Sequence, residues 1–358
     1  MRSVINITDL SISEILELTE VAADIENHPE KYSQACKGKK LATLFFEPST
    51  RTRLSFEAAM YELGGEVIGF SDASNSSTVK GEGIFDTAKV ISCYADIIAM
   101  RHFIEGAPMC ASLNASIPVI NAGDGSHSHP TQTLADIYTV KKQLGRLDNI
   151  IIGCCGDLKY GRTVHSLVEA FINFKNVKFI FIAPSELSIP KRMKRELLEK
   201  NNVEFVETES LEDHIHELDV LYMTRIQKER FSDIDEYERL KDQYILSSDK
   251  LKAAKENLCI MHPLPRVNEI TLDVDDDPRA CYFKQVKNGK IMRMALILKL
   301  LADKGTETND QYFELENVQC NHSLCVTYND KRVKRLFKKS DNDPSKTVCY
   351  YCEHIVDI

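Results

Sequence analysis

The sequence predicts an α/β protein with two doubly wound parallel-sheet lobes and a small C-terminal domain. Short apolar runs alternate with segments of helical periodicity between residues 40 and 261, as in parallel sheets whose strands are connected by helices. The alternation starts again after Gly145, which indicates a second lobe. Four of the 11 cysteines follow residue 319, in a segment too short to bury a core of its own.

The first lobe is predicted from residue 13 to residue 144. A helix over 13–23 follows Asp9 and Ser11, which are both suitable caps. Residues 71–83 are rich in Ser, Gly and Asn without an apolar period, so we expect a mobile surface loop there. The other predicted elements are strands over 40–46, 66–70, 95–100 and 117–120, and helices over 49–63, 85–94 and 129–144.

The second lobe is predicted from five apolar strands, over 150–155, 177–183, 203–206, 220–223 and 258–261. A strong helix follows over 292–301, where apolar residues dominate. The polar segment 305–311 has the composition of a linker.

Composition and charge exclude several classes of protein. With 43% hydrophobic residues, 15 Phe and 13 Tyr, the chain is neither disordered nor fibrous. Its formal net charge of -9 repels nucleic acid, so we expect no nucleic-acid partner. The longest apolar stretches, 177–184 and 294–302, are far shorter than the roughly 20 residues of a membrane helix. Because no secretory signal is recognised either, we expect no membrane contact and a cytoplasmic location.

One local pattern points to an anion site. Ser49, Thr50, Arg51 and Thr52 lie where a strand turns into a helix, so free backbone N–H groups, hydroxyls and a guanidinium converge there. Arginine adds a bidentate donor that suits phosphate. The alternative is an ordinary helix cap with solvated arginines.

Five motifs extend this pattern along the chain. They are FEPSTRTR at 46–53, MRH at 100–102, HPTQ at 129–132, GDLKYGRTVHS at 156–166 and HPLPR at 262–266. Together they resemble the aspartate carbamoyltransferase catalytic chain, in register from about Ile5 to Leu301. TRIQKER at 224–230, with GRTVHS and HPLPR, is similar to the aspartate branch in particular, and the motifs of an ornithine enzyme are absent.

The resemblance implies a fold and a reaction. It implies a carbamoyl-phosphate-binding domain over 1–133, an aspartate-binding domain over 134–291, and a helix over 292–304 that returns to the first domain. The aspartate amine would attack carbamoyl phosphate directly, without a covalent enzyme intermediate or an organic cofactor, in pyrimidine biosynthesis. The linker over 305–311 and a last domain over 312–358 would follow.

The resemblance also implies the residues that contact carbamoyl phosphate. They are Ser49, Thr50, Arg51, Thr52, Arg101, His129, Gln132, Pro263, Leu264 and Pro265. Of these, Arg51, Thr52, Arg101 and His129 would be catalytic, together with Lys80. Taken alone, His129 is more typical of a helix start or a core, and Gln132 of a surface. Their i, i+3 spacing nevertheless places both on one helical face.

Aspartate carries two carboxylates, which separate arginines recognise well. The resemblance implies that Arg162, Arg225, Gln227, Leu264 and Lys80 bind it. Lys80 and nearby Ser76 would reach from the loop 71–83 into the site of an adjacent subunit, which implies a homotrimer. Taken alone, each arginine is more typical of a surface position or a helix-start ion pair.

The four late cysteines form two short-spaced pairs, Cys320-x4-Cys325 and Cys349-x2-Cys352, which can close a tetrahedral thiolate site. We predict structural Zn²⁺, because four protein ligands leave no open position and so short a segment needs a metal to fold. Disulfides are the weaker alternative in a reducing cytoplasm. His322 and His354 are adjacent to these cysteines in the sequence, and either could replace one cysteine as a metal ligand.

The spacing of the cysteines, with NVQC at 317–320 and CYYCE at 349–353, resembles the zinc domain of the aspartate carbamoyltransferase regulatory chain. The resemblance implies a fusion of the catalytic chain to a zinc-binding β domain, which serves docking and could build assemblies larger than a trimer. Residues 312–358 hold seven basic and seven acidic residues, so the basic run at 331–339 indicates an interface rather than a nucleic-acid site.

Two other functions compete with this interpretation. One is a carbamoyltransferase that uses another amine acceptor, and the other is a non-catalytic scaffold whose zinc tail binds a partner. The acceptor used and the release of phosphate distinguish the three.

Overall fold

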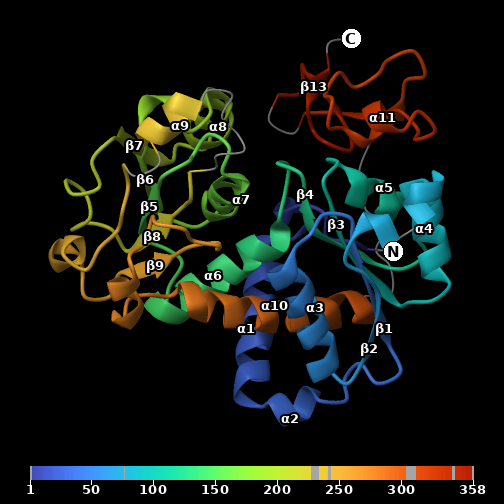
Figure 1. The fold of residues 1–358 in the computed structure, drawn as a ribbon, viewed down its shortest axis with the longest axis horizontal. Helices are drawn as coiled ribbons and strands as arrows, with labels where there is room; N and C mark the ends of the chain where they lie inside the picture. Colours follow the sequence, from blue (N-terminus) through green and yellow to red (C-terminus); the bar gives the residue numbers. More distant parts are fainter. Residues whose placement is uncertain are drawn as a thin grey trace. The chain divides into compact units, whose positions relative to one another are not determined.

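The structure is a computed structural model that describes residues 2–75, 77–226, 234–240, 243–303, 312–340 and 343–356 (Figure 1). The chain forms two compact units. The first unit contains Met1–Thr131 and Gly289–Ile358, and the second contains Gln132–Asn288. Among the described residues, no helix combines the length and the apolar character that a bilayer crossing requires.

The first unit is built on a four-stranded parallel sheet with the order β2-β1-β3-β4. Its strands are β1 (Lys40–Phe45), β2 (Glu66–Phe70), β3 (Ile97–His102) and β4 (Val119–Asp124). The strands β1, β3 and β4 are buried almost throughout, as expected for a parallel sheet whose two faces are covered. Apolar residues of β1 and β3 form a core with Phe46, Ala88 and Val119.

Helices of the first unit precede, connect and follow these strands. They are α1 (Ile12–Asn27), α2 (Pro29–Tyr32), α3 (Thr50–Glu62), α4 (Ile84–Ser92) and α5 (Ala107–Asn114), with the start of α6 (Pro130–Leu144) and the end of α10 (Tyr282–Ala302). Ser11 caps α1, because its hydroxyl accepts from the N–H of Glu14, whose carboxylate accepts in return from the N–H of Ser11. The predicted cap is therefore confirmed for Ser11.

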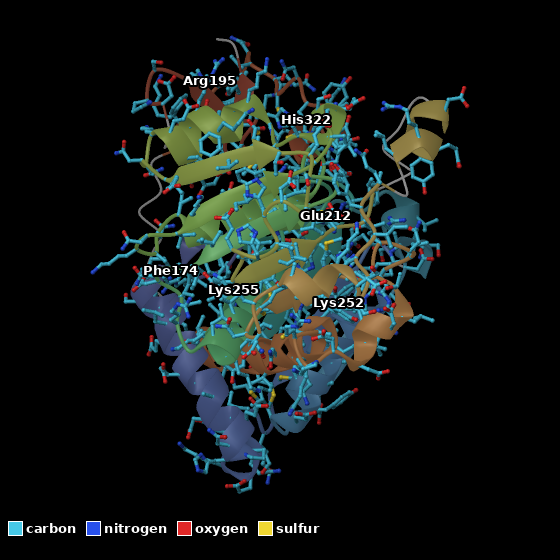
Figure 2. The ribbon with its side chains drawn as sticks, turned by 90° about the vertical axis from the view of Figure 1, so that its left-hand side faces the viewer. Phe174, Arg195, Glu212, Lys252, Lys255 and His322 are labelled. Atoms are coloured by element: carbon cyan, nitrogen blue, oxygen red, sulfur yellow. The ribbon has the colours of Figure 1, made fainter. Side chains whose placement is uncertain are left out.

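The second unit contains a five-stranded parallel sheet with the order β7-β6-β5-β8-β9. Its strands are β5 (Ile151–Cys155), β6 (Lys178–Ile182), β7 (Glu204–Thr208), β8 (Val220–Met223) and β9 (Cys259–Met261), and its helices include α7 (Arg162–Phe171), α8 (Lys191–Met193) and α9 (Ile234–Leu240). Phe174, labelled in Figure 2, follows α7 and packs on Phe171 with ring centroids 5.5 Å apart.

The C-terminal tail, residues 312–358, forms a small antiparallel sheet in the order β10-β11-β12-β13. Its elements are β10 (Phe313–Glu314), α11 (Val326–Asn329), β11 (Leu336–Lys339), β12 (Thr347–Cys349) and β13 (Ile355–Val356). The four late cysteines belong to its core, together with Phe337 and Tyr351. Two parallel α/β sheets and a small β domain confirm the predicted fold class.

Several elements differ from the prediction. The helix predicted over 292–301 is the end of α10, which begins at Tyr282, because a single Gly289 inside it costs only about 1 kcal/mol. Helices α5 and α7 were not predicted. The loop 71–83 contains two short 3-10 helices, η2 (Ala73–Asn75) and η3 (Ser77–Lys80), and the predicted linker at 305–311 lies outside the described residues.

Candidate functional site

The start of α3 presents the predicted anion-binding residues. Strand β1 ends at Phe45 and α3 begins at Thr50, with Ser49 in the N-cap position, where its side chain makes no capping hydrogen bond. The first N–H groups of a helix lack intrahelical partners and attract anions. Partial burial, and then the positive charge of Arg101, lower the pKa of Arg51. Two guanidinium groups therefore lie close to this helix start.

Arg101 and His129 approach each other beside Gly123. Arg101, near the end of β3, donates from Nη1 to the carbonyl of Ala122 (3.3 Å), and its Nε lies 3.1 Å from Oε2 of Glu47. Gly123 has a φ of +115°, and a Cβ built on it would lie 2.9 Å from Arg101 Nη1 and 3.3 Å from His129 Cδ2. Burial lowers the pKa of Arg101, and Glu47 opposes this shift only in part.

The buried carboxylate of Asp124 holds the turn that precedes His129 in place. Asp124 accepts hydrogen bonds from the N–H groups of Gly106 (2.9 Å) and Ser128 (3.1 Å) and from the side chain of Asn121 (2.9 Å). His129 is only 5% exposed, and its Nδ1 lies 3.4 Å from the Thr131 hydroxyl. The histidine is thus held by a rigid turn rather than by a mobile loop.

Lys80 ends η3 and is exposed, while Ser76 lies outside the described residues. The tail contacts the segment that follows Lys80. Arg332 donates from Nη2 to the carbonyl of Gly81 (3.3 Å), and its guanidinium lies 5.3 Å from the ring centroid of Phe85. The loop with the predicted lysine is therefore connected to the C-terminal tail.

In the second unit, Arg162 and Arg225 follow neighbouring strands. Arg162 is the first residue of α7, beyond the end of β5, and Arg225 lies two residues after β8. Since β5 and β8 pair in parallel, with Cys155 opposite Met223, the carboxyl ends of both strands lie at the same edge of the sheet, where α/β proteins bind ligands. Gln227 lies outside the described residues.

The turn after β9 carries Pro263, Leu264 and Pro265. His262 fixes this turn, because its Nδ1 accepts from the N–H of Leu264 (2.8 Å) and its Nε2 lies 2.7 Å from Oε1 of Glu269. Leu264 has a φ of +53° and precedes a cis peptide bond. Burial alone would raise the pKa of Glu269, but the hydrogen bonds from His262 and from the Val267 N–H outweigh it, and the pKa is lowered.

The four cysteines of the tail have the geometry of a metal site. Their sulfur atoms all lie within 4.8 Å of one another and are buried. The Sγ atoms of Cys320 and Cys352, and those of Cys325 and Cys349, are 3.7 Å apart. A tetrahedral site with Zn–S bonds of about 2.3 Å has S–S edges of about 3.8 Å, whereas a disulfide requires about 2.05 Å. The residues therefore fit zinc.

A second cluster, which the sequence did not predict, lies where the tail meets the first sheet's loops. Glu105 Oε2 is 2.8 Å from His322 Nε2, and the rings of His322 and His354 stack with centroids 3.8 Å apart; His322 is labelled in Figure 2. The backbone of Glu105 also bonds to Leu324 and Val326 of the tail. These two histidines thus group with Glu105 and not with the cysteines.

Two family models match consecutive parts of the chain. Residues 2–142 match the family "Aspartate/ornithine carbamoyltransferase, carbamoyl-P binding domain", and residues 148–300 match "Aspartate/ornithine carbamoyltransferase, Asp/Orn binding domain". The chain belongs to the aspartate/ornithine carbamoyltransferase family. The resemblance seen in the motifs of the catalytic chain is confirmed, and the tail lies beyond the matched residues.

Three similar proteins are catalytic subunits of aspartate carbamoyltransferases. The aspartate carbamoyltransferase catalytic subunit of Clostridium botulinum (strain Langeland) is 57% identical over 300 residues, which cover 84% of this chain and 98% of the relative. That of Clostridium acetobutylicum is 58% identical with the same coverage. The catalytic subunit of M. jannaschii aspartate transcarbamoylase superposes with a TM-score of 0.80 at 51% identity, covering 85% of this chain and 99% of that one.

A more distant carbamoyltransferase has been solved with substrates. The Trypanosoma cruzi aspartate transcarbamoylase in complex with carbamoyl phosphate is 36% identical, with a TM-score of 0.79, and the match covers 84% of this chain and 96% of that one.

Two site residues were not predicted from the sequence. They are Glu47, which holds Arg101, and Asp124, which holds the turn before His129. Glu47 lies inside the FEPSTRTR motif, and this position could have identified it as a site residue.

Proposed function

We propose that the protein is an aspartate carbamoyltransferase, which converts carbamoyl phosphate and L-aspartate to N-carbamoyl-L-aspartate and phosphate. The observation that carries this proposal is the 57% identity to catalytic subunits of that enzyme across 98% of their length. The arrangement of Arg51, Arg101 and His129 in the first unit supports the same chemistry, because leaving phosphate requires fixed positive charge and donors.

In the first unit, the start of α3 and Arg101 bind the phosphate. Ser49, Thr50, Arg51 and Thr52 contribute hydroxyls, N–H groups and a guanidinium at the helix terminus. Thr52, Arg101 and His129 donate to the carbamoyl oxygen, where negative charge develops as the amine attacks. Because Arg101 is largely desolvated, its interaction with that charge is stronger than it would be in water.

In the second unit, Arg162 and Arg225 recognise the two carboxylates of aspartate, assisted by Gln227 and Leu264. The carbonyl groups of Pro263 and Leu264, with Gln132, accept hydrogen bonds from the carbamoyl NH2, and Pro265 completes the turn. Leu264 adopts a left-handed φ in this turn. No covalent intermediate is required, because the amine and the carbamoyl carbon react directly.

The experiment that tests this function offers ¹³C-labelled carbamoyl phosphate with either aspartate or ornithine and identifies the product by NMR. We expect N-carbamoyl-aspartate with aspartate and no product above the uncatalysed rate with ornithine. Product with ornithine and not with aspartate would favour the alternative acceptor, and no product with either amine would favour a non-catalytic scaffold.

For the tail, we propose a structural Zn²⁺ held by Cys320, Cys325, Cys349 and Cys352. Four buried thiolates saturate a tetrahedral ion, so the metal takes no part in the reaction. The tail would then be a zinc-binding β domain fused to the catalytic chain. The support for the proposal is the 3.7 Å spacing of the sulfur atoms.

We also propose a homotrimer in which Lys80 and Ser76 complete the site of an adjacent subunit, with the zinc domain available for higher assembly. The test mixes two inactive variants, Lys80→Ala and His129→Ala, after dissociation. Recovered activity is expected, because some interfaces then combine an intact Lys80 with an intact His129. If mixing restores no activity, each site is complete within one chain.

The cytoplasmic location and the lack of nucleic-acid partners stay predictions of the sequence.

A further inference from the structure

The buried carboxylate of Asp136 is surrounded by hydrogen-bond donors. Asp136 lies on α6, one turn after Gln132, and is 0% exposed. Its Oδ1 accepts from Nε2 of Gln132 (2.8 Å) and from Nε2 of Gln285 (2.5 Å), and its Oδ2 accepts from the hydroxyl of Tyr222 (3.0 Å). All four residues belong to the second unit.

These donors fit an ionised carboxylate, which can only accept hydrogen bonds. Burial, and then the charge of Asp136, raise the pKa of Tyr222 well above its usual value, so the phenol keeps its proton and donates. Both glutamine amides must likewise present their NH2 groups to Asp136. The carboxylate therefore fixes which end of each amide faces it.

For Gln132, this orientation leaves Oε1 as the outer end of the amide. An amide that could rotate would present NH2 or oxygen to a ligand with similar ease, because the two ends have nearly the same shape. With its NH2 directed at Asp136, Gln132 presents an acceptor. An acceptor is what the NH2 group of carbamoyl phosphate requires.

Gln285 links Asp136 to the turn after β9 by hydrogen bonds. Its Nε2 is directed at Asp136, and its Oε1 accepts from the N–H of His262 (3.1 Å). The Nδ1 of His262 in turn accepts from the N–H of Leu264 (2.8 Å). One carboxylate thus orders Gln132 directly and the 263–265 turn through Gln285 and His262.

We propose that Asp136 is a positioning residue that makes the site selective for a carbamoyl group, by fixing the acceptors that its NH2 requires. The proposal rests on the proposed function, since Gln132 and the turn 263–265 are its carbamoyl contacts. Asp136 itself touches no substrate. Its role is to exclude acyl phosphates that carry a methyl group where carbamoyl phosphate carries NH2.

The test compares carbamoyl phosphate with acetyl phosphate, which differs by that replacement. We measure kcat/KM for carbamoyl phosphate, and the inhibition constant of acetyl phosphate against it, in the wild type and in Asp136→Leu, which is of similar size but offers no acceptor to either glutamine. We expect kcat/KM to fall about tenfold or more, the factor that one hydrogen bond supplies. The inhibition constant of acetyl phosphate should change less than twofold. Equal losses for both ligands would overturn the proposal, because a general distortion of the site affects both.

Two further variants keep the result interpretable. In the Gln132→Ala background, Asp136→Leu should cost little additional kcat/KM, whereas undiminished additional loss would contradict action through Gln132. Tyr222→Phe is the matched control, because it removes a hydrogen bond from the same carboxylate but leaves the Gln132 contact. Tyr222→Phe should leave the selectivity for carbamoyl phosphate over acetyl phosphate unchanged. A loss of selectivity equal to that of Asp136→Leu would count against the proposal.

If Asp136→Leu does not fold, Asp136→Ser replaces it, since a hydroxyl both donates and accepts and cannot fix an amide. Failure of the proposed function has a different signature. In that case the wild type would not convert carbamoyl phosphate and aspartate at all. If only this inference fails, the wild type is active and the variant loses its affinity for both ligands equally.

Discussion

The side chains of Arg101 and His129 both border the space that a side chain at Gly123 would fill. A Cβ on Gly123 would stand 2.9 Å from Arg101 Nη1 and 3.3 Å from His129 Cδ2, and the φ of +115° is one that other residues rarely adopt. Because Gly123 has no side chain, Arg101 from β3 and His129 from the turn before α6 can both lie beside it.

Gly123→Ala should lower kcat/KM for carbamoyl phosphate by at least tenfold, because the methyl group displaces Arg101 or His129. Steady-state kinetics measure this. The matched control is Gly38→Ala, at a glycine with a φ of +77° and open space around its Cβ position. An equal loss in both variants would show that the effect comes from backbone strain and not from the displaced donors.

Arg51→Ala should remove about 2.7–4 kcal/mol of transition-state stabilisation, the typical cost of one lost donor. The reason is the loss of a guanidinium at the start of α3, beside Arg101. The control is Arg53→Ala on the same helix, since Arg53 pairs with Glu57 at 3.1 Å and should change kcat/KM little. Near-normal turnover of Arg51→Ala would contradict the phosphate-site assignment.

Removing the metal should unfold the tail. The tail has too few apolar residues to hold its four thiols together without an ion, so Cys325→Ser should lose bound zinc and amide protection over 313–356. Elemental analysis and hydrogen exchange measure both quantities. Cys93→Ser, at an exposed cysteine outside the cluster, should keep one zinc per chain. A metal-free wild type with a protected tail would refute the zinc site.

Arg332→Gln should loosen the segment after Lys80 while the metal stays bound. The variant removes the hydrogen bond to the Gly81 carbonyl and the contact with the Phe85 ring, so amide exchange over 81–85 should become faster. Arg335→Gln is the control, because Arg335 bonds to Glu316 within the tail. Similar exchange over 81–85 in both variants would mean that Arg332 does not hold this segment.

His102 should make the protein less stable in acid. Burial lowers the pKa of His102 to about 4 from 6.5, and its Nδ1 accepts from the N–H of Ile104 (2.8 Å). Between these two values the unfolded chain binds a proton that the folded chain does not, so stability falls as the pH decreases from 6.5 to 4. The loss should be about 3 kcal/mol at 1.36 kcal/mol per pKa unit.

Denaturation midpoints at pH 7 and pH 4.5 measure this contribution. His102→Asn keeps a side-chain acceptor for the Ile104 N–H and does not titrate, so its midpoint should depend less on pH than that of the wild type. Identical pH dependence in the two proteins would show that His102 is not the group responsible.

Local sequence signals predicted the local features of this fold. Ser11 with Glu14 is a capping box that can be read from four residues, and the spacing of Cys320 and Cys325 already indicates a metal ligand pair. The spacing of apolar residues alone did not predict helix α5, which starts next to Gly106, a residue in a left-handed conformation. It also did not find the first half of α10, where polar residues interrupt the apolar pattern.

The contacts that join distant segments could not be read from the sequence. Gln285 and Asp136 are 149 residues apart, and Glu105 and His322 are 217 residues apart. Taken alone, each of these residues is an ordinary polar residue on a helix or loop. Only the folded chain shows that Asp136 faces three donors and that Glu105 faces the tail, because burial and partner choice depend on tertiary packing.

The most direct test of the site is calorimetric titration with N-(phosphonacetyl)-L-aspartic acid, the compound bound to the Trypanosoma cruzi relative. We predict one molecule bound per chain, with weaker binding in both Arg51→Ala and Arg225→Ala. Phosphonoacetate, which lacks the aspartate half, should lose affinity in Arg51→Ala and not in Arg225→Ala. A wild type that binds neither compound, or an Arg51→Ala variant that binds both unchanged, would contradict the account.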